Sequence, residues 1–463
     1  MCFFFAVPEI LYAAENSSGS DGGHDSLALV FFFVAVMLLF AGVGALAKKI
    51  GQPPVLGELV MGIVLGILAF VPGLGIIDTL KHHNFIIALA ELGVIILLFR
   101  TGLETNVKEM LQVGPRAFFV ACLGVVLPFI GGYFVSSLIF PESMIIGTLS
   151  FATFLFVGAT LTATSVGITA RVFSDLGFSK SKESKIVLGA AVIDDVLGLI
   201  FLAVVSGIVS SLAVGEALST SEILGLAGRL TVVSFGFIAG LIILGQFIAP
   251  KIGKFFAGIS TGVGMKVILA LFFCLTGAYG SSLIGLASMV GAFAAGLFLD
   301  PVHFSSFGSP DISKKVKSWR GYVSDPSVGK DMEETAHRQE HTHVEDLIDT
   351  IALFLVPVFF VYTGMQVDIS VFANINILWI ALVITAVAFI GKIASGLVAG
   401  SGVNKKIVGF GMVPRGEVGL IFVNEGKKLG VVNEEVFAVA IIVVIVSTLL
   451  TPIFLNYLIK KKS

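Results

Sequence analysis

The stretch from Gly189 to Ile200 reads GAAVIDDVLGLI and places two adjacent carboxylates, Asp194 and Asp195, in an apolar segment of membrane-span length. A charge near the centre of a bilayer is costly, so two carboxylates there need partners or protons. Adjacent carboxylates in a low dielectric cannot both ionise cheaply, so one of them favours its protonated form. A group that alternates between a proton and an oxygen-bound hard cation needs this property. We therefore predict that Asp194 and Asp195 bind cations and protons, the alternative being a purely structural role.

The composition around this stretch is that of a membrane protein. Hydrophobic residues make up 56% of the 463-residue chain and charged residues only 13%, whereas soluble domains carry about 25% charged residues. The net charge of −2 is spread over loops, so no nucleic-acid partner is indicated. Cys2, Cys122 and Cys274 lie in apolar surroundings without metal-ligand spacing, which argues against disulfides or a zinc site. We expect an all-α polytopic protein of the lipid bilayer, neither an enzyme nor a cofactor protein.

Hydropathy places thirteen transmembrane spans along the chain. They cover residues 27–47, 54–72, 86–100, 114–137, 144–170, 186–211, 223–247, 264–280, 282–299, 347–366, 377–400, 407–426 and 436–459. Residues 1–26 are a stub or a weak signal-like segment, and residues 300–346 form a loop that contains histidines and acids. This loop divides the membrane domain into a first part, 27–299, and a second part, 347–463.

The basic residues predict the orientation, because cytoplasmic loops carry an excess of lysine and arginine. If the first span starts outside, only Lys81, Arg229, Lys427 and Lys428 among the 29 basic residues fall in outer loops. The C-terminus is then cytoplasmic.

Spans 2–6 and spans 9–13 predict two inverted five-helix repeats, over 54–211 and 282–459, with the span 223–247 as a linker. The fourth span of each repeat is interrupted: Gly158–Arg171 reads GATLTATSVGITAR, and Val408–Phe422 reads VGFGMVPRGEVGLIF. Helix breakers at corresponding positions of two inverted halves indicate a transport site. The alternative is that these glycines serve only helix packing.

Polar side chains in the two interrupted spans are candidates for this site. Thr162, Thr164 and Ser165 carry hydroxyls at mid-depth, which can bind backbone groups freed from a helix. In the other span, Pro414 breaks the helix, and Arg415 and Glu417 can pair with each other or offset the dipole ends of the half-helices.

Three further charged residues lie in or near spans. Lys392 in the eleventh span is too deep to reach the membrane surface easily, so it needs a carboxylate partner such as Asp194 or Asp195, or it deprotonates. Glu58 and Glu91 either line an access path or stabilise a helix contact.

The loop 300–346 holds His337, His341 and His343 among acidic residues. This histidine cluster can set activity against cytoplasmic pH or bind a metal weakly, and the alternative is a solvated insertion.

Taken together, these motifs resemble the monovalent cation:proton antiporter superfamily, and within it the NapA-type branch of electrogenic sodium/proton antiporters. The resemblance covers nearly the whole chain. It rests on Gln52–Gly66, Leu92–Thr105, the TATSVGIT stretch 162–169, the Asp194–Asp195 pair, Phe354–Asp368 and the GMVPRGEVGLI stretch 411–421.

The resemblance implies a core with two crossed, unwound helices, a separate scaffold that forms a homodimer, and elevator-like alternating access in the inner cell membrane. Asp195 would be the ligand for Na⁺ and the proton, and Asp194 would be the partner of Lys392. Branches with asparagine in place of the first acid look electroneutral, so Asp194 favours electrogenic exchange. We further expect Asp194 to join Asp195 as a ligand when Na⁺ arrives. The alternatives are a K⁺/H⁺ antiporter or potassium efflux protein of the same superfamily and, less favoured, a sodium-coupled organic-solute symporter.

Overall fold

The computed structural model describes residues 22–50, 52–104, 114–145, 150–175, 178–179, 181–213, 220–299, 307, 319, 326–368, 370 and 374–462. These residues are almost entirely helical, which confirms the predicted all-α class. The predicted stub falls outside the described residues up to residue 21, and the first helix then begins at Gly22.

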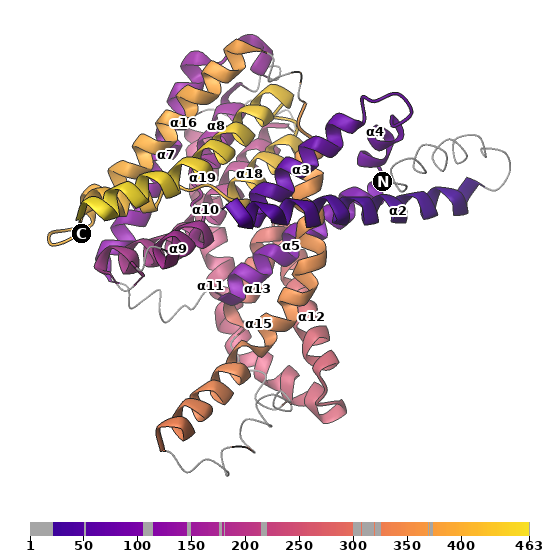
Figure 1. Cartoon of the computed structure of the whole chain (residues 1–463), viewed down its shortest axis with the longest axis vertical. Coiled ribbons are helices and arrows are strands. Elements are labelled where there is room, and N and C mark those ends of the chain that lie inside the picture. The colour runs from indigo at the N-terminus through magenta and orange to yellow at the C-terminus, as the bar shows by residue number, and fades with distance from the viewer. Residues whose placement is uncertain are drawn as a thin grey trace. The chain divides into compact units, whose positions relative to one another are not determined.

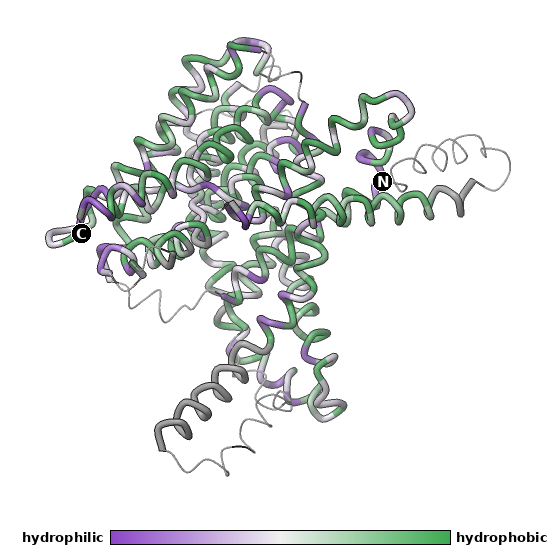
Figure 2. The backbone as a smooth tube through the Cα atoms, in the orientation of Figure 1, coloured by the Kyte–Doolittle hydropathy of each residue, from purple (hydrophilic) through white to green (hydrophobic). Residues whose placement is uncertain are grey.

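Nine helices in the described ranges are long and apolar enough to cross a membrane. They are α2 (Gly22–Gly44), α5 (Asn84–Glu104), α7 (Pro115–Ile139), α10 (Lys182–Ala213), α11 (Thr220–Ile259), α12 (Val263–Leu283), α15 (Pro326–Met365), α16 (Ile375–Ser395) and α19 (Glu434–Lys462). Figure 2 shows that hydrophobic residues dominate the parts of these helices that it colours by hydropathy. The protein is therefore a multi-pass membrane protein.

The other four predicted spans fall on short or interrupted helices, so helix length alone does not confirm the count of thirteen. These elements are α3 (Pro54–Leu68), α13 (Ser288–Phe298), the pair α8 (Ser150–Thr160) and α9 (Val166–Asp175), and the pair α17 (Lys405–Gly411) and α18 (Glu417–Lys428). Short connecting helices are η1 (Ala45–Ile50), α4 (Ile76–Lys81), η2 (Glu142–Met144) and η5 (Gly396–Val398).

The long helix α15 corrects one boundary. It begins at Pro326, inside the range 300–346 that was predicted to be a loop. The stretch is polar, which hydropathy interprets as a loop, but it contains four glutamates and one each of lysine, methionine, alanine, arginine and glutamine, which favour helix. The rest of that range falls outside the described residues except Phe307 and Trp319, and so do the side chains of the histidine cluster.

The chain divides into two compact units. The first comprises Met1–Glu91, Lys108–Thr231 and Pro357–Ser463, and the second comprises Leu92–Val107 and Val232–Val356. In the second unit, α12 packs along α13. All the helices that carry the candidate site belong to the first unit.

The predicted repeat is visible in the order of the helices. A short helix, two long helices, an interrupted helix and a long helix follow one another as α3, α5, α7, α8–α9 and α10, and again as α13, α15, α16, α17–α18 and α19. Within the first unit, α7 packs on α8 and α10, and α16 packs on α17 and α19. The opposite membrane orientation of the two repeats stays a prediction.

The helices α7 and α16 also pack directly on each other and lie side by side in Figure 1. A Cβ atom at Gly391 of α16 would lie 2.9 Å from the backbone nitrogen of Pro128 on α7. In the reciprocal contact, a Cβ atom at Gly131 of α7 would lie 2.7 Å from Val387 Cγ1 on α16. Both helices therefore use glycine for a close approach, as expected for equivalent members of a repeat.

Candidate functional site

Two interrupted helices cross in the core of the first unit. The helix α8 ends at Thr160 and α9 begins at Val166, while α17 ends at Gly411 and α18 begins at Glu417. The Ser165 backbone N–H donates to the Pro414 carbonyl at 2.8 Å, so the two unwound segments touch. This confirms the predicted pair of crossed, discontinuous helices.

Hydroxyl groups satisfy the carbonyls that the second break sets free. Thr164 Oγ1 donates to the Met412 carbonyl at 3.0 Å, and Thr169 Oγ1 donates to the Gly411 carbonyl at 2.7 Å. These two carbonyls lie at the C-terminal end of α17, where an uninterrupted helix would have bonded them internally. The threonines of the first interrupted span therefore stabilise the break in the second.

The carboxylate Asp194 on α10 binds Lys392 on α16. The Lys392 ammonium donates to both carboxylate oxygens, at 2.8 Å and 3.1 Å, and both side chains are 0% exposed. The two residues come from the fifth helix of one repeat and the third helix of the other. A fully buried ion pair with these distances is stable only while both partners keep their charges.

The second carboxylate, Asp195, is 7% exposed and belongs to the same helix α10. Its charge and that of Arg415 both act on Lys392, in addition to the charge of Asp194. Four ionisable groups thus share one buried region of the core, two of them acidic and two basic.

Arg415 lies in the second unwound segment and is 1% exposed. Its Nη1 donates to the Ala163 carbonyl in the first unwound segment at 2.5 Å, so the guanidinium joins the two breaks. Its Nε and Nη2 have no hydrogen-bond partner among the residues that the structure describes. Arg415 therefore binds backbone rather than Glu417.

Glu417 occupies the first turn of α18, where a negative charge is favourable because of the helix dipole. Its Oε2 accepts a long hydrogen bond of 3.5 Å from the Ser165 hydroxyl. Of the two roles predicted for Glu417, this geometry matches the offset of a half-helix dipole.

The hydroxyl of Thr162 donates to the Ala159 carbonyl at 2.8 Å and keeps lone pairs that can accept. A Cβ atom at Gly198 would lie 3.9 Å from Thr162 Oγ1. Gly198 follows Asp194 by one turn of α10, so this hydroxyl faces the carboxylate-bearing helix one turn from Asp194.

The structure places the two remaining predicted acids elsewhere. Glu58 is 9% exposed on α3, which packs on α2 and η1. Glu91 is half exposed on α5, and its carboxylate lies 2.8 Å from the Lys428 ammonium at the end of α18. The ion pair of Glu91 and the helix contacts of α3 do not involve Asp194, Asp195 or Lys392.

Two residues next to the site carried no distinctive sequence signal. A Cβ atom at Gly124 on α7 would lie 3.6 Å from Lys392 Nζ and 3.7 Å from Asp194 Oδ1, so this glycine lines the ion pair. Thr448 on α19 is 3% exposed and donates to the Arg415 carbonyl at 2.5 Å. A glycine or a threonine in an apolar helix looks the same in sequence whether or not it faces a site.

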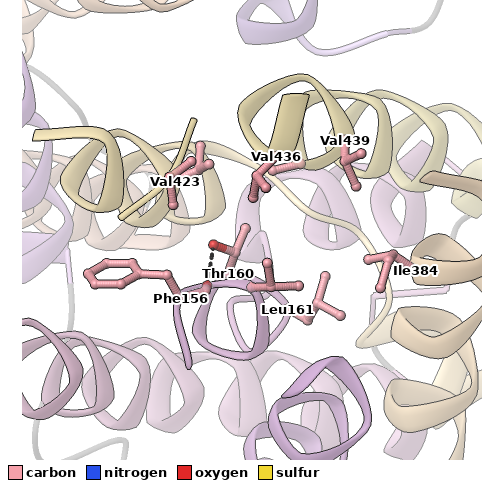
Figure 3. A pocket seen from close by; sticks show the side chains of 10 residues that line it. Phe156, Thr160, Leu161, Ile384, Val423, Val436 and Val439 are labelled. Carbon is pink, nitrogen blue, oxygen red and sulfur yellow. Dashed lines mark hydrogen bonds between the residues drawn. The ribbon is translucent and has the colours of Figure 1, made fainter. Parts of the chain in front are cut away.

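An apolar pocket lies beside the first break, between α8, α16, α18 and α19 (Figure 3). Its lining is aliphatic and aromatic apart from Thr160, whose hydroxyl donates to the Phe156 carbonyl. The lining residues are Phe156, Val157, Thr160, Leu161, Ile384, Val423, Val432, Val436, Val439 and Ala440. Apart from this one hydroxyl, the lining side chains carry no oxygen atom that could bind a cation.

Comparison with known proteins gives consistent matches over most of the chain. The family described as "Sodium/hydrogen exchanger, transmembrane" matches residues 34–461. The chain is 34% identical to the high-affinity Na⁺/H⁺ antiporter NhaS3 of Synechocystis, over 89% of this chain and 86% of that protein. It is 32% identical to the Na⁺/H⁺-K⁺ antiporter GerN of Bacillus cereus, over 92% of this chain and 95% of that protein.

A solved structure shares the fold. The sodium proton antiporter MjNhaP1 of Methanocaldococcus jannaschii, determined at pH 8, superposes with a TM-score of 0.61 at 16% sequence identity. The match covers 93% of this chain and 96% of that chain.

Proposed function

The chain belongs to the sodium/hydrogen exchanger family, and on this basis we propose that it is a secondary antiporter that exchanges a monovalent alkali cation, with sodium preferred, for protons. The observation that carries the proposal is the fully buried Asp194–Lys392 pair with Asp195 beside it in the core that holds the two crossed breaks. Buried ionisable groups within a membrane protein are costly and mark ion or proton pathways.

We assign the alternating ligand to Asp195. In the proton-loaded state Asp195 is neutral, and Lys392 is protonated and paired with Asp194. A cation that arrives at Asp195 displaces its proton and attracts Asp194 as a second oxygen ligand. Oxygen atoms of Thr162, Thr164 and Ser165 in the first unwound segment complete the site, because hydroxyls that donate one hydrogen bond still offer lone pairs.

When Asp194 turns to the cation, Lys392 is left buried without a carboxylate partner, and burial disfavours the charged form of lysine. Lys392 then releases its proton. One proton from Asp195 and one from Lys392 leave for each cation bound, so the exchange moves net charge.

The way in which the site reaches each side of the membrane is a further part of the proposal. We propose that the core bearing the two breaks moves against a scaffold, so that the site faces each side of the membrane in turn, and that the scaffold forms a homodimer in the cell membrane with the C-terminus in the cytoplasm. The excess of basic residues on one side of the spans supports this orientation.

Potassium is the principal alternative substrate, because the similar protein GerN is described as a Na⁺/H⁺-K⁺ antiporter. An organic anion would need a roomy cavity with basic or aromatic groups to bind it, and Lys392 of the core is already bound to Asp194. We therefore favour an alkali cation over a solute.

The experiment is exchange by the purified protein in proteoliposomes that contain a pH dye. Sodium, lithium and potassium are added in turn to vesicles with an acidic interior, and each transported cation should raise the internal pH. The sodium response is then repeated at membrane potentials set with valinomycin. A response that does not depend on potential would contradict the two-proton mechanism, and no response to any cation would contradict antiport.

A further inference from the structure

The helix α19 occupies the same place in the second repeat as α10 does in the first, since each follows an interrupted helix. The two sequences can be laid over each other: Val192–Ile200 reads VIDDVLGLI, and Ile445–Ile453 reads IVSTLLTPI. In this alignment Ser447 stands where α10 has Asp194, and Thr448 stands where α10 has Asp195. The second repeat thus presents hydroxyls at the position of the carboxylates.

The three hydroxyls in this part of α19 are all buried, but they differ in what they bind. Ser447 Oγ donates to the Val444 carbonyl, and Thr451 Oγ1 donates to the Ser447 carbonyl, so both bind their own helix. Thr448 Oγ1 donates instead to the Arg415 carbonyl in the second unwound segment, at 2.5 Å. A carboxylate at this position could not donate this bond, because an ionised carboxylate only accepts.

Arg415 connects Thr448 to the candidate cation site. The bond from Thr448 fixes the backbone of Arg415, whose Nη1 donates to the Ala163 carbonyl between Thr162 and Thr164. The remaining nitrogens, Nε and Nη2, are buried and have no hydrogen-bond partner among the described residues. Arg415 is also close enough to Lys392 and Asp194 for their charges to interact.

We propose that Thr448 is a positioning residue for cation binding, which acts through Arg415 to hold the first unwound segment in the conformation that presents its oxygen atoms to the cation. The inference rests on the proposed antiport function. The equivalent helices of the two repeats then have different roles. The helix α10 supplies the carboxylates, and α19 supplies the hydrogen-bond donor that, through Arg415, orders the first unwound segment.

The test compares three variants in the proteoliposome assay, with sodium concentration varied at fixed pH. Thr448→Val removes the hydroxyl and keeps the shape, Thr448→Ser keeps the hydroxyl, and Thr451→Val removes a buried hydroxyl of the same helix that does not reach Arg415. Because a hydrogen bond is worth about 1 kcal/mol, Thr448→Val should raise the apparent sodium KM roughly fivefold. The KM of Thr448→Ser and of Thr451→Val should stay near wild type, and kcat should change less than KM.

A merely structural role predicts a different pattern. Thr448→Val would then lower the amount of folded protein and leave the KM of the remaining protein unchanged, or it would match Thr451→Val. Either result would overturn the inference. If Thr448→Val does not fold, Thr448→Ala and Thr448→Ser form a second pair that differs only in the hydroxyl, and equal KM values for the two would overturn it as well.

The wild-type control separates this inference from the function on which it rests. A wild-type protein that moves no protons with sodium, lithium or potassium would overturn the proposed function and this inference with it. An active wild type together with an unaltered KM in Thr448→Val would overturn the role of Thr448 alone.

Discussion

The buried pair of Asp194 and Lys392 allows a quantitative prediction about stability. Both side chains are 0% exposed, and the ammonium lies 2.8 Å and 3.1 Å from the two carboxylate oxygens. Removal of one partner from such a pair leaves an uncompensated buried charge, which costs about 3–5 kcal/mol. Asp194→Asn and Lys392→Gln should each destabilise the protein by about this amount. The double variant should lose less than the sum, because it leaves neither partner charged and unpaired.

The chain supplies a matched control for this cycle. Lys428 and Glu91 also lie 2.8 Å apart, but their side chains are 46% and 47% exposed. An exposed pair of the same chemistry contributes about 0–1 kcal/mol, so Glu91→Gln and Lys428→Gln should have little effect.

The assay is thermal unfolding of the detergent-purified variants at one pH and one lipid content, followed by the loss of the monodisperse fraction in gel filtration. Both buried single variants should unfold at clearly lower temperature than wild type, the double variant should recover part of the loss, and the control pair should stay near wild type. The prediction would be contradicted if the single variants of Asp194 and Lys392 were as stable as those of Glu91 and Lys428. It would also be contradicted if the double variant lost as much stability as the two single variants added together.

Three further predictions concern transport and packing. Protons and cations compete for Asp195. Below the pH range in which the site loses its proton, each further pH unit of acidification should therefore raise the apparent cation KM by up to about tenfold. A KM that stays constant from acidic to alkaline pH would exclude a shared site. Lys392→Gln should make sodium exchange insensitive to membrane potential, measured at clamped potentials, and unchanged voltage dependence would mean that Lys392 only stabilises the core. Gly124→Ala should keep near-normal exchange, because its Cβ would make only ordinary contacts with Lys392 and Asp194. Gly124→Leu should displace the ion pair and slow exchange at least tenfold. Equal exchange rates for the two variants would contradict the position assigned to this glycine.

The sequence predicts those features of the core that are unfavourable in an ordinary membrane helix. Charged residues such as Asp194 and Lys392 stand out in apolar spans, because a charge in the bilayer needs a partner. The breaks in α8–α9 and α17–α18 were predicted because glycine, proline and clustered threonines at mid-depth are unfavourable in an uninterrupted helix. These features locate the core from the sequence alone.

Other features depend on how the helices rotate and cross. The contact of Gly124 with the ion pair and the bond from Thr448 to Arg415 are set by helix packing, which leaves no trace in an apolar stretch. The pairing of Glu91 with Lys428 joins residues far apart in the chain, so the sequence left the role of Glu91 open. The early start of α15 at Pro326 was missed because polar helix formers reduce hydropathy without reducing helix propensity.

The most direct test of the central claim is a comparison of wild type with Asp195→Asn, reconstituted at equal density in proteoliposomes with an acidic interior and an internal pH dye. Asparagine keeps the size of the side chain but cannot bind and release a proton in this pH range. Addition of sodium outside should raise the internal pH in wild-type vesicles, while Asp195→Asn, verified as folded by gel filtration, should produce no sodium-driven change. Substantial sodium-driven proton movement by the folded variant would contradict the claim that one carboxylate, Asp195, alternates between proton and cation.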